Sequence, residues 1–328
     1  MSITITVYSS QPYDEQYLRQ AGGDFNWHFV NASLNSETVE LARGSNAVCI
    51  FVNDLADRSI LSKFNELGVR VIALRCAGFN NVDVSAAKEL GLQVARVPAY
   101  SPEAVAEHCV AMILCLNRKI HKAYNRVRDD NFSLNGLLGF NLHGKTAGLI
   151  GTGRIGLATT RILTGFGMRV LCYDIHPQPA ALPAGAVYCD LATLYSEADI
   201  ISLHCPLTPQ THHLINAQSL SQMKDQVMLI NTSRGGLIDT KAVIDALKSK
   251  KIGLLGLDVY EQEADLFFKD LSDQVIADEV FQRLLTFPNV LITGHQAFFT
   301  DEALSQISQT TVANIQALLS QQDCPNIL

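Results

Sequence analysis

The stretch TAGLIGTGRIGLATTRILTGFGMRVLCYD, residues 146–174, decides the fold. It begins and ends with short apolar runs, residues 146–150 and 169–173, that are typical of buried strands. Between these runs, apolar residues recur at the spacing of one helix face. The turn from the first strand into the helix contains three glycines: Gly151, Gly153 and Gly156. The stretch therefore predicts a strand, a glycine-rich turn, a helix and a second strand.

Each glycine of this turn has a use in dinucleotide binding. Gly151 permits the tight turn, Gly153 lets the backbone approach a pyrophosphate, and Gly156 lets the helix pack close to the strand. The pyrophosphate then meets free N–H groups at the positive end of the helix dipole. Asp174, 18 residues after Gly156, is placed to accept hydrogen bonds from the adenosine ribose and to repel a 2′-phosphate. A glycine turn alone is weak evidence, but with both strands, the helix and the acid it predicts NAD as the cofactor.

Length and composition set the class of protein. A chain of 328 residues is long enough for two domains, and 48% hydrophobic with 17% charged residues is too apolar for a disordered chain. A net charge of −7 argues against nucleic acid as the main partner. The N-terminal residues lack a basic targeting segment, and the longest apolar run, Val110–Leu116, is too short to cross a bilayer. We therefore predict no membrane partner and a cytoplasmic location.

The same alternation of strand and helix runs through the chain. Apolar runs predict strands at Ile3–Tyr8, Ala47–Phe51, Val71–Leu74, Gln93–Val97, Ile200–Leu203, Val227–Asn231, Leu254–Val259 and Val290–Thr293. Helical spacing predicts helices at Ser62–Leu67, Val82–Leu90, Thr240–Lys250 and Asp301–Ser320, and one long helix over Ser101–Asp130. The tail, Gln321–Leu328, carries no readable pattern. This order predicts an α/β fold with two doubly wound parallel sheets.

Polar residues follow the later strands, at the sheet edge where such folds bind ligands. They are His204–Pro206, Asn231–Arg234, Asp258 with Glu261 and Glu263, and Gly294-His295. Loops are polar in general, which explains any one group but not all four. Reducing a ketone beside NADH needs a cation to hold a carboxylate, a proton donor that titrates near neutrality, and a carboxylate to orient that donor. The polar residues after the later strands include a residue of each type: the cation Arg234, the proton donor His295 and the carboxylate Glu263.

We predict no metal site and no disulfide framework. The eight cysteines, which form no CxxC pair, are Cys49, Cys76, Cys109, Cys115, Cys172, Cys189, Cys205 and Cys324. Several lie in apolar strands, as reduced core residues do. The pair His212 and His213 suggests metal binding, but adjacent side chains diverge on a helix or strand and no third ligand is near in sequence.

Seven segments carry a resemblance to a known family. They are RCAGFNNVD (75–83), VPAYSPEAVAEH (97–108), GTGRIG (151–156), HCPLTPQT (204–211), INTSRGGLID (230–239), GLDVYEQEADLFF (256–268) and ITGHQAFFTDEAL (292–304). Over essentially its whole length the chain resembles the D-isomer-specific 2-hydroxyacid dehydrogenases. The resemblance implies Rossmann-like and flavodoxin-like domains, with an NAD domain (101–298) inserted in a split substrate domain (1–100 plus 299–328). It also implies a homodimer joined through the NAD domain, in which the helix from Ser101 would suit the seam.

The resemblance assigns the site residue by residue. Arg234 would hold the substrate carboxylate, His295 would transfer the proton, and Glu263 would pair with His295. Besides the three glycines, the implied NAD contacts are Arg154, Ile155, Asp174, Cys205, Pro206, Thr211, Thr232, Ser233 and Asp258. Beyond Arg234, the implied substrate contacts are the backbone of Ala77-Gly78, Tyr100 and Phe298. Closure of the cleft would exclude water from the hydride.

The segments after Glu263 and His295, ADLFF and QAFFT, look like those of members that act on lactate and branched 2-hydroxyacids. The resemblance thus implies reversible reduction of pyruvate to D-lactate. Phe298 and Phe299 would wall a small pocket, or equally would pack at a domain junction. Two alternatives stay open: a longer 2-oxoacid as substrate, and a dehydrogenase-like protein that senses NADH and recruits partners.

Overall fold

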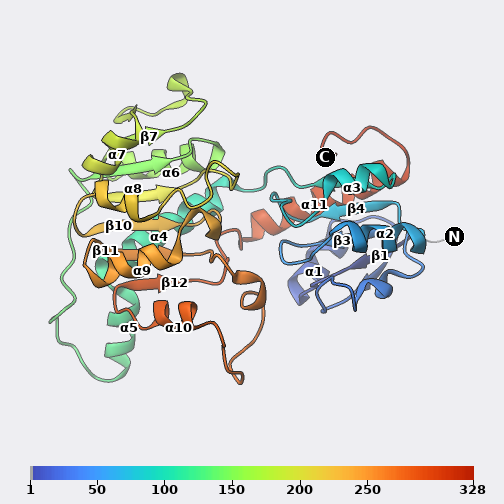
Figure 1. Ribbon diagram of the computed structural model, residues 1–328, viewed down its shortest axis with the longest axis horizontal. Helices are drawn as coiled ribbons and strands as arrows, with labels where there is room; N and C mark the ends of the chain where they lie inside the picture. The colour runs from blue at the N-terminus through green and yellow to red at the C-terminus, as the bar shows by residue number, and fades with distance from the viewer. Residues whose placement is uncertain (1–2) are drawn as a thin grey trace. The chain divides into compact units, whose positions relative to one another are not determined.

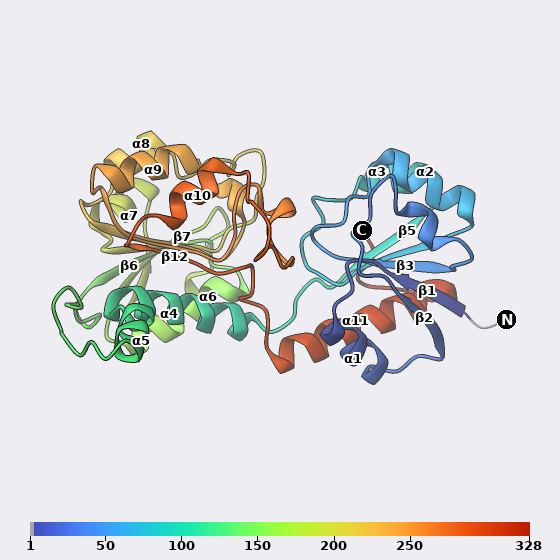
Figure 2. The same cartoon turned by 90° about the horizontal axis from the view of Figure 1, so that it is seen from below.

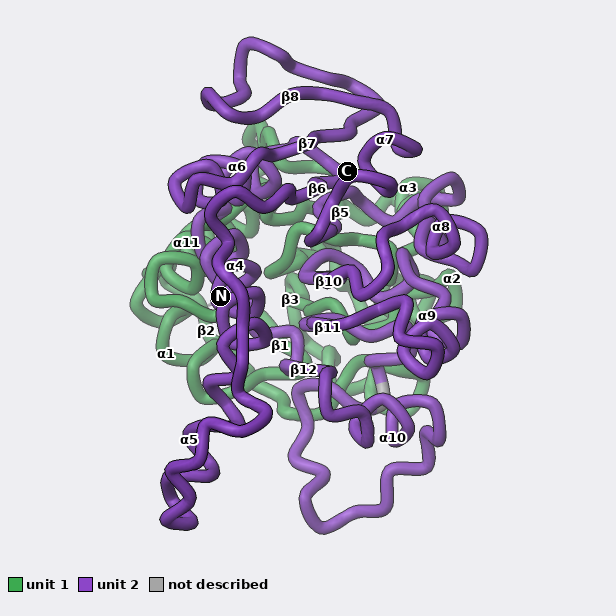
Figure 3. The backbone as a smooth tube through the Cα atoms, turned by 90° about the vertical axis from the view of Figure 1, so that its left-hand side faces the viewer, with its two compact units in different colours: residues 1–101, 299–328 green, residues 102–298 purple. Residues whose placement is uncertain are grey.

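The computed structural model describes residues 3–328, and the chain divides into two compact units. Unit 1 contains Met1–Ser101 and Phe299–Leu328, and unit 2 contains Pro102–Phe298 (Figure 3). In the described part of the chain, no helix is both long enough and apolar enough to cross a membrane.

Unit 1 is built on a five-stranded parallel sheet in the order β2-β1-β3-β4-β5 (Figure 1). Its strands are β1 (Ile3–Val7), β2 (Phe25–Phe29), β3 (Ala47–Ile50), β4 (Val71–Leu74) and β5 (Gln93–Arg96). Its helices are α1 (Pro12–Gln20), α2 (Arg58–Leu67), α3 (Val84–Glu89) and α11 (Asp301–Leu319). Helices α2 and α3 cover one face of the sheet, and α1 and α11 cover the other (Figure 2). This strand order is that of flavodoxin-like folds.

Unit 2 is built on a seven-stranded parallel sheet in the order β12-β11-β10-β9-β6-β7-β8. Its strands are β6 (Thr146–Ile150), β7 (Arg169–Tyr173), β8 (Ala186–Tyr188), β9 (Ile200–Leu203), β10 (Val227–Asn231), β11 (Ile252–Leu257) and β12 (Val290–Ile292). Its helices are α4 (Pro102–Arg118), α5 (Ile120–Arg128), α6 (Arg154–Gly165), α7 (Leu191–Glu197), α8 (Ala217–Gln222), α9 (Thr240–Lys248) and α10 (Glu279–Leu285). Helices α4, α5 and α6 lie on one face, and α7 to α10 lie on the other (Figure 2).

The predicted fold class is confirmed. Strands β6 to β11 follow the Rossmann order, with β12 added at one edge. Strands β3, β4, β9 and β10 are buried at every position, because helices cover both faces of each sheet. The order reverses between β9 and β6, so the switch point lies beside the glycine turn.

The structure differs from the local predictions at several points, and three of these differences have a clear physical reason. The helix predicted over Ser101–Asp130 ends at Arg118, because Lys119 takes a left-handed conformation (φ 52°), and α5 starts anew at Ile120. The strand β2, FNWHF, was missed because it is an edge strand without buried positions. The tail is also structured: Leu328 N donates to Val94 O (2.9 Å), so the end of the chain pairs with β5.

Candidate active site

The glycine turn between β6 and α6 is tightly packed on one side and open on the other. Gly151 has φ +101°, and a Cβ built there would lie 2.5 Å from the carbonyl carbon of His204. A Cβ on Gly156 would lie 2.0 Å from the carbonyl oxygen of Gly151. Gly153, the N-cap of α6, has no neighbouring atom within 4 Å of its Cβ position. The turn therefore presents free space at the amino end of a 12-residue helix, where a phosphate binds.

Asp174 lies next to this turn, at the end of β7. Its carboxylate accepts hydrogen bonds from Thr152 N (2.6 Å), Thr152 Oγ1 (3.0 Å) and His176 N (2.9 Å). Burial opposes ionisation, but these hydrogen bonds outweigh it and hold the pKa of Asp174 below its ordinary value. The carboxylate is thus ionised at neutral pH, as required to accept from ribose hydroxyls.

The residues at the switch point fit NAD. Among the described residues, Thr232 Oγ1 is a buried oxygen without a hydrogen-bond partner, and Thr232 follows β10 directly. A ligand that reaches this edge of the sheet would satisfy it. The open Gly153 position, the ionised Asp174 and the Thr232 hydroxyl are the features that a bound dinucleotide would use.

We expect Gly156→Ala to abolish NADH binding and to lower the melting temperature, because the new methyl group cannot coexist with the Gly151 carbonyl. Gly165→Ala is the matched control. It lies at the end of the same helix with nothing within 4 Å of its Cβ position, so it should stabilise by about 0.5–1 kcal/mol. Fluorescence titration measures the affinity for NADH, and thermal unfolding measures the melting temperature. Unchanged NADH affinity in Gly156→Ala would contradict this role of the turn.

We expect Asp174→Ala to weaken NAD binding by about 100-fold, the value of two hydrogen bonds to a charged group. Because the pKa of Asp174 is lowered, its carboxylate stays charged as the pH falls, so preference for NAD over NADP should be constant from about pH 8 to pH 5. Ratios of kcat/KM for the two cofactors test this, with the exposed Asp225→Ala as control. A preference that vanishes below pH 6 would show that the carboxylate is not the discriminating group.

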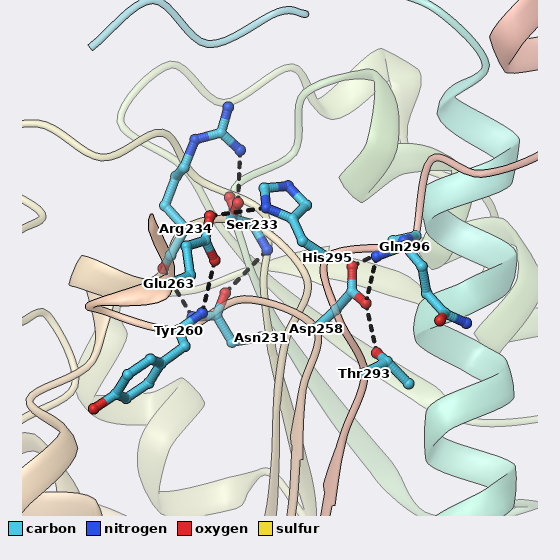
Figure 4. A network of polar contacts seen from close by, with 10 residues as sticks. Asn231, Ser233, Arg234, Asp258, Tyr260, Glu263, Thr293, His295 and Gln296 are labelled. Carbon is cyan, nitrogen blue, oxygen red and sulfur yellow. Dashed lines mark hydrogen bonds and ion pairs between the residues drawn. The ribbon is translucent and has the colours of Figure 1, made fainter. Parts of the chain in front are cut away.

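The structure brings His295 and Glu263 together (Figure 4). His295 Nδ1 donates to Glu263 Oε1 at 2.9 Å, and Tyr260 N donates to Glu263 Oε2 at 2.9 Å. Both side chains are mostly buried, with 14% of His295 and 23% of Glu263 exposed. Because Nδ1 is bonded to the carboxylate, Nε2 is the nitrogen that is available to a substrate.

Arg234 belongs to a loop after β10 that is held by its own side chains. Asn231 Nδ2 donates to Arg234 O (2.8 Å), and Ser233 Oγ donates to Cys205 O (2.7 Å). The Arg234 guanidinium donates to Ser233 O (2.7 Å) and lies beside the Glu263–His295 pair in Figure 4. Only glycine fits at position 235, because a Cβ on Gly235 would lie 2.1 Å from the Tyr260 carbonyl group. The loop that carries Arg234 and the turn that carries Glu263 are therefore packed against each other.

Asp258 holds the loop that carries His295. It is fully buried, its backbone oxygen accepts from His295 N (2.7 Å), and His295 takes a left-handed conformation (φ 55°). Its carboxylate is surrounded by Thr293 Oγ1 (2.5 Å), Gln296 N (2.9 Å), Ala297 N (2.8 Å) and His108 Nε2 (3.4 Å). Burial would raise the pKa of Asp258, but these donors lower it. Sequence reasoning missed this support by His108 and Thr293, which lie far apart in the chain. The contact of Asp258 with the nicotinamide stays a prediction.

The other residues predicted to face NAD lie around the switch point. Arg154 and Ile155 begin α6, and Arg154 is exposed. Cys205 is buried after β9, and burial raises the pKa of its thiol to about 11. Thr211 Oγ1 donates to the carbonyl oxygen of the exposed Pro206 (2.7 Å), which closes the loop between them.

The predicted substrate contacts of unit 1 follow the ends of β4 and β5. The carbonyl groups of Ala77 and Gly78 accept from Arg96 Nη1 (2.7 Å) and Cys76 Sγ (3.2 Å). Tyr100 is half-buried and lies near the end of the N-terminal segment of unit 1. Phe299, in unit 1, packs edge-on against Tyr13 with ring centroids 4.8 Å apart. Phe298, the last residue of unit 2, is buried.

A Rossmann-ordered sheet, a glycine turn, an acid after the second strand and an acid–base pair at the carboxyl edge of the same sheet define an NAD-dependent oxidoreductase. The family model described as D-isomer specific 2-hydroxyacid dehydrogenase, NAD binding domain, matches residues 110–297. The D-lactate dehydrogenase of Escherichia coli (strain K12) is 58% identical over 326 residues, covering 99% of both chains. The chain belongs to the D-isomer-specific 2-hydroxyacid dehydrogenase family.

Solved structures agree with this assignment. The apo-structure of D-lactate dehydrogenase from Escherichia coli superimposes with a TM-score of 0.91 at 55% identity, covering 99% of this chain and 100% of that one. The D-lactate dehydrogenase from Aquifex aeolicus, complexed with NAD and lactic acid, gives a TM-score of 0.86 at 36% identity, with coverage of 97% and 96%. The predicted family and the predicted cofactor NAD are confirmed.

Proposed function

We propose that the protein is an NAD-dependent D-lactate dehydrogenase that interconverts pyruvate and D-lactate. The observation that carries the proposal is the hydrogen bond from His295 Nδ1 to Glu263, held beside Arg234 at the edge of an NAD-binding sheet. The full-length similarity to D-lactate dehydrogenases supports lactate as the product.

The reaction assigns one task to each side chain. Bound NADH supplies a hydride for the C2 carbon of pyruvate. Arg234 holds the pyruvate carboxylate through paired N–H groups, which fixes C2 and polarises its carbonyl group. His295 donates a proton from Nε2 to the carbonyl oxygen as the hydride arrives, so pyruvate, NADH and one proton give lactate and NAD. Glu263 holds the imidazole ring in the orientation that this transfer needs.

The substrate contacts proposed outside the triad are Ala77, Gly78, Tyr100 and Phe298. Ala77 and Gly78 come three and four residues after the end of β4, and Tyr100 comes four residues after the end of β5, so they lie beyond the carboxyl ends of these strands. Ligands of open α/β sheets bind at that edge. Phe298 comes three residues after His295 and is buried, and we propose that it contacts the substrate methyl group.

Steady-state oxidation of NADH tests the substrate class. We expect kcat/KM for pyruvate to exceed that for 2-oxoisocaproate and phenylpyruvate by about tenfold or more, since each unfavourable methylene in a small pocket costs about 1–3 kcal/mol. A preference for the longer acids would keep the mechanism and overturn the proposed substrate. NADH binding without turnover on any 2-oxoacid would instead favour an NADH-sensing protein.

A second copy of the chain is the proposed partner of unit 2. One face of α5 exposes Ile120, Tyr124 and Val127, each more than half exposed. The segment after it exposes Phe132 (70%), Leu134 (82%) and Leu138 (87%). Exposed apolar side chains in such numbers are typical of an interface. In contrast, α4 buries nine of its side chains. The seam proposed here is therefore the second half of the helix predicted from Ser101, which is α5, together with residues 131–139.

Light scattering measures the oligomeric state. We expect the wild-type mass to be that of a dimer, and Leu134→Asp with Leu138→Asp to give a monomer. Val275→Asp is the control, because Val275 is equally exposed (96%) but lies elsewhere in unit 2. A monomeric wild type would contradict the proposal. The cytoplasmic location stays a prediction.

A further inference from the structure

Two adjacent histidines and a distant glutamate form a cluster on the surface of unit 2. His212 and His213 lie in the loop after β9, and Glu261 lies after β11. Each offers one ligand atom, and the three atoms lie within 4.8 Å of one another. No metal is predicted here from the sequence, because adjacent side chains diverge on a regular helix or strand and no third ligand is near. Neither reason holds in the folded chain.

The backbone conformation of His213 brings the two imidazoles together. His213 has φ +51°, in the left-handed region that non-glycine residues rarely adopt. In this conformation the two rings stack, with centroids 3.9 Å apart and an interplanar angle of 24°.

The third group comes from a neighbouring strand. His213 Nε2 donates to Glu261 Oε1 at 2.6 Å, while Glu261 Oε2 accepts from Thr240 Oγ1 at 2.9 Å. One carboxylate oxygen thus faces the histidines, and the other is fixed from behind. Metal-binding carboxylates are commonly oriented by such an outer hydrogen bond.

We propose that His212, His213 and Glu261 bind a divalent transition-metal ion of the zinc class. Two imidazoles and one carboxylate, with water in the fourth position, are a zinc ligand set. Imidazole nitrogen favours Zn²⁺, Ni²⁺ and Cu²⁺ over Mg²⁺ and Ca²⁺. Ligands about 2.1 Å from one ion stand about 3.4 Å apart. The His213–Glu261 pair, now at 2.6 Å, would open to that distance, and rotation of the exposed His212 side chain would bring in the second imidazole.

The metal cluster, His212, His213 and Glu261, is connected to the loops of the proposed active site. His213 N donates to Gly236 O at 2.9 Å, two residues after Arg234. Glu261 follows Tyr260, whose N–H donates to Glu263. An ion that enters between His213 and Glu261 would widen their spacing from 2.6 Å to about 3.4 Å and so move both attachments. If the proposed function holds, occupancy of the site therefore slows pyruvate reduction.

Metal binding is tested directly, without reference to activity. Calorimetric titration of the chelator-treated full chain with Zn²⁺ is expected to show one strong ion per chain in the micromolar range. Co²⁺ should give the visible absorption of a four-coordinate site. We expect His212→Gln and Glu261→Gln each to weaken Zn²⁺ binding by about tenfold or more. His143→Gln, a change at an exposed histidine near the amino end of β6, should bind as the wild type does.

Two results would overturn the site. One is the absence of Zn²⁺ binding above the level of a Mg²⁺ titration, which would leave His213–Glu261 as a surface ion pair. The other is unchanged binding in both variants, which would place the ion elsewhere. The coupling is tested separately: Zn²⁺ should slow NADH oxidation by the wild type and His143→Gln, but not by Glu261→Gln. Equal inhibition of all three would contradict the coupling.

Discussion

Replacing His295 with asparagine is expected to lower kcat for pyruvate reduction by about 1000-fold, the usual contribution of a positioned proton donor. Asparagine has no side-chain proton that it can give to the substrate and then regain from solvent. NADH binding should change by no more than about twofold, because the glycine turn and Asp174 that hold the cofactor lie on other loops. Stopped-flow reduction of pyruvate and fluorescence titration with NADH measure the two quantities separately.

The matched control for this change is His143→Asn. His143 is exposed and precedes β6, at the end of the sheet opposite to the switch point. We expect its kinetics to equal those of the wild type. A His295→Asn enzyme that retains more than about a tenth of the wild-type kcat would remove His295 from the role of proton donor.

Replacing Arg234 with lysine is expected to lower kcat/KM for pyruvate by about 100-fold, although the charge is kept. The guanidinium group offers two parallel N–H groups to a carboxylate, whereas an ammonium group is a single point charge. The loss should appear in both KM and kcat, since the same contact binds pyruvate and orients its carbonyl group. The backbone of the loop should survive, because Asn231 and Ser233 hold it through groups that the change leaves in place.

Arg169→Lys is the control for Arg234→Lys. Arg169 forms an exposed ion pair with Glu197 (2.6 Å) at the start of β7. Such a pair contributes little, so this variant should be kinetically silent. If Arg234→Lys is equally silent, the carboxylate is held by another group.

The sequence predicted what depends on local pattern. The glycine turn, the parallel strands and the acid after β7 are recognisable because each requires particular residues at fixed spacing. The residues after the predicted strands also come together: Arg234, Glu263 and His295 follow β10, β11 and β12, whose carboxyl ends meet at one edge.

Features that depend on single backbone angles or on distant contacts were not predictable. The left-handed Lys119 divides one predicted helix into two, and the left-handed His213 brings adjacent rings together. Neither residue is a glycine, so nothing in the sequence predicts a left-handed backbone at these positions. The burial of Asp258 beneath His108 and Thr293 likewise depends on α4 and β12, which are far apart in the chain. Tertiary packing decided each of these cases.

The most direct measurement is the stereochemistry of the product. The purified protein, incubated with pyruvate and NADH, is analysed by chiral chromatography. The proposed function predicts lactate of the D configuration alone, formed in equal amount to the NADH oxidised. L-lactate, a racemic product, or no lactate despite NADH binding would contradict it.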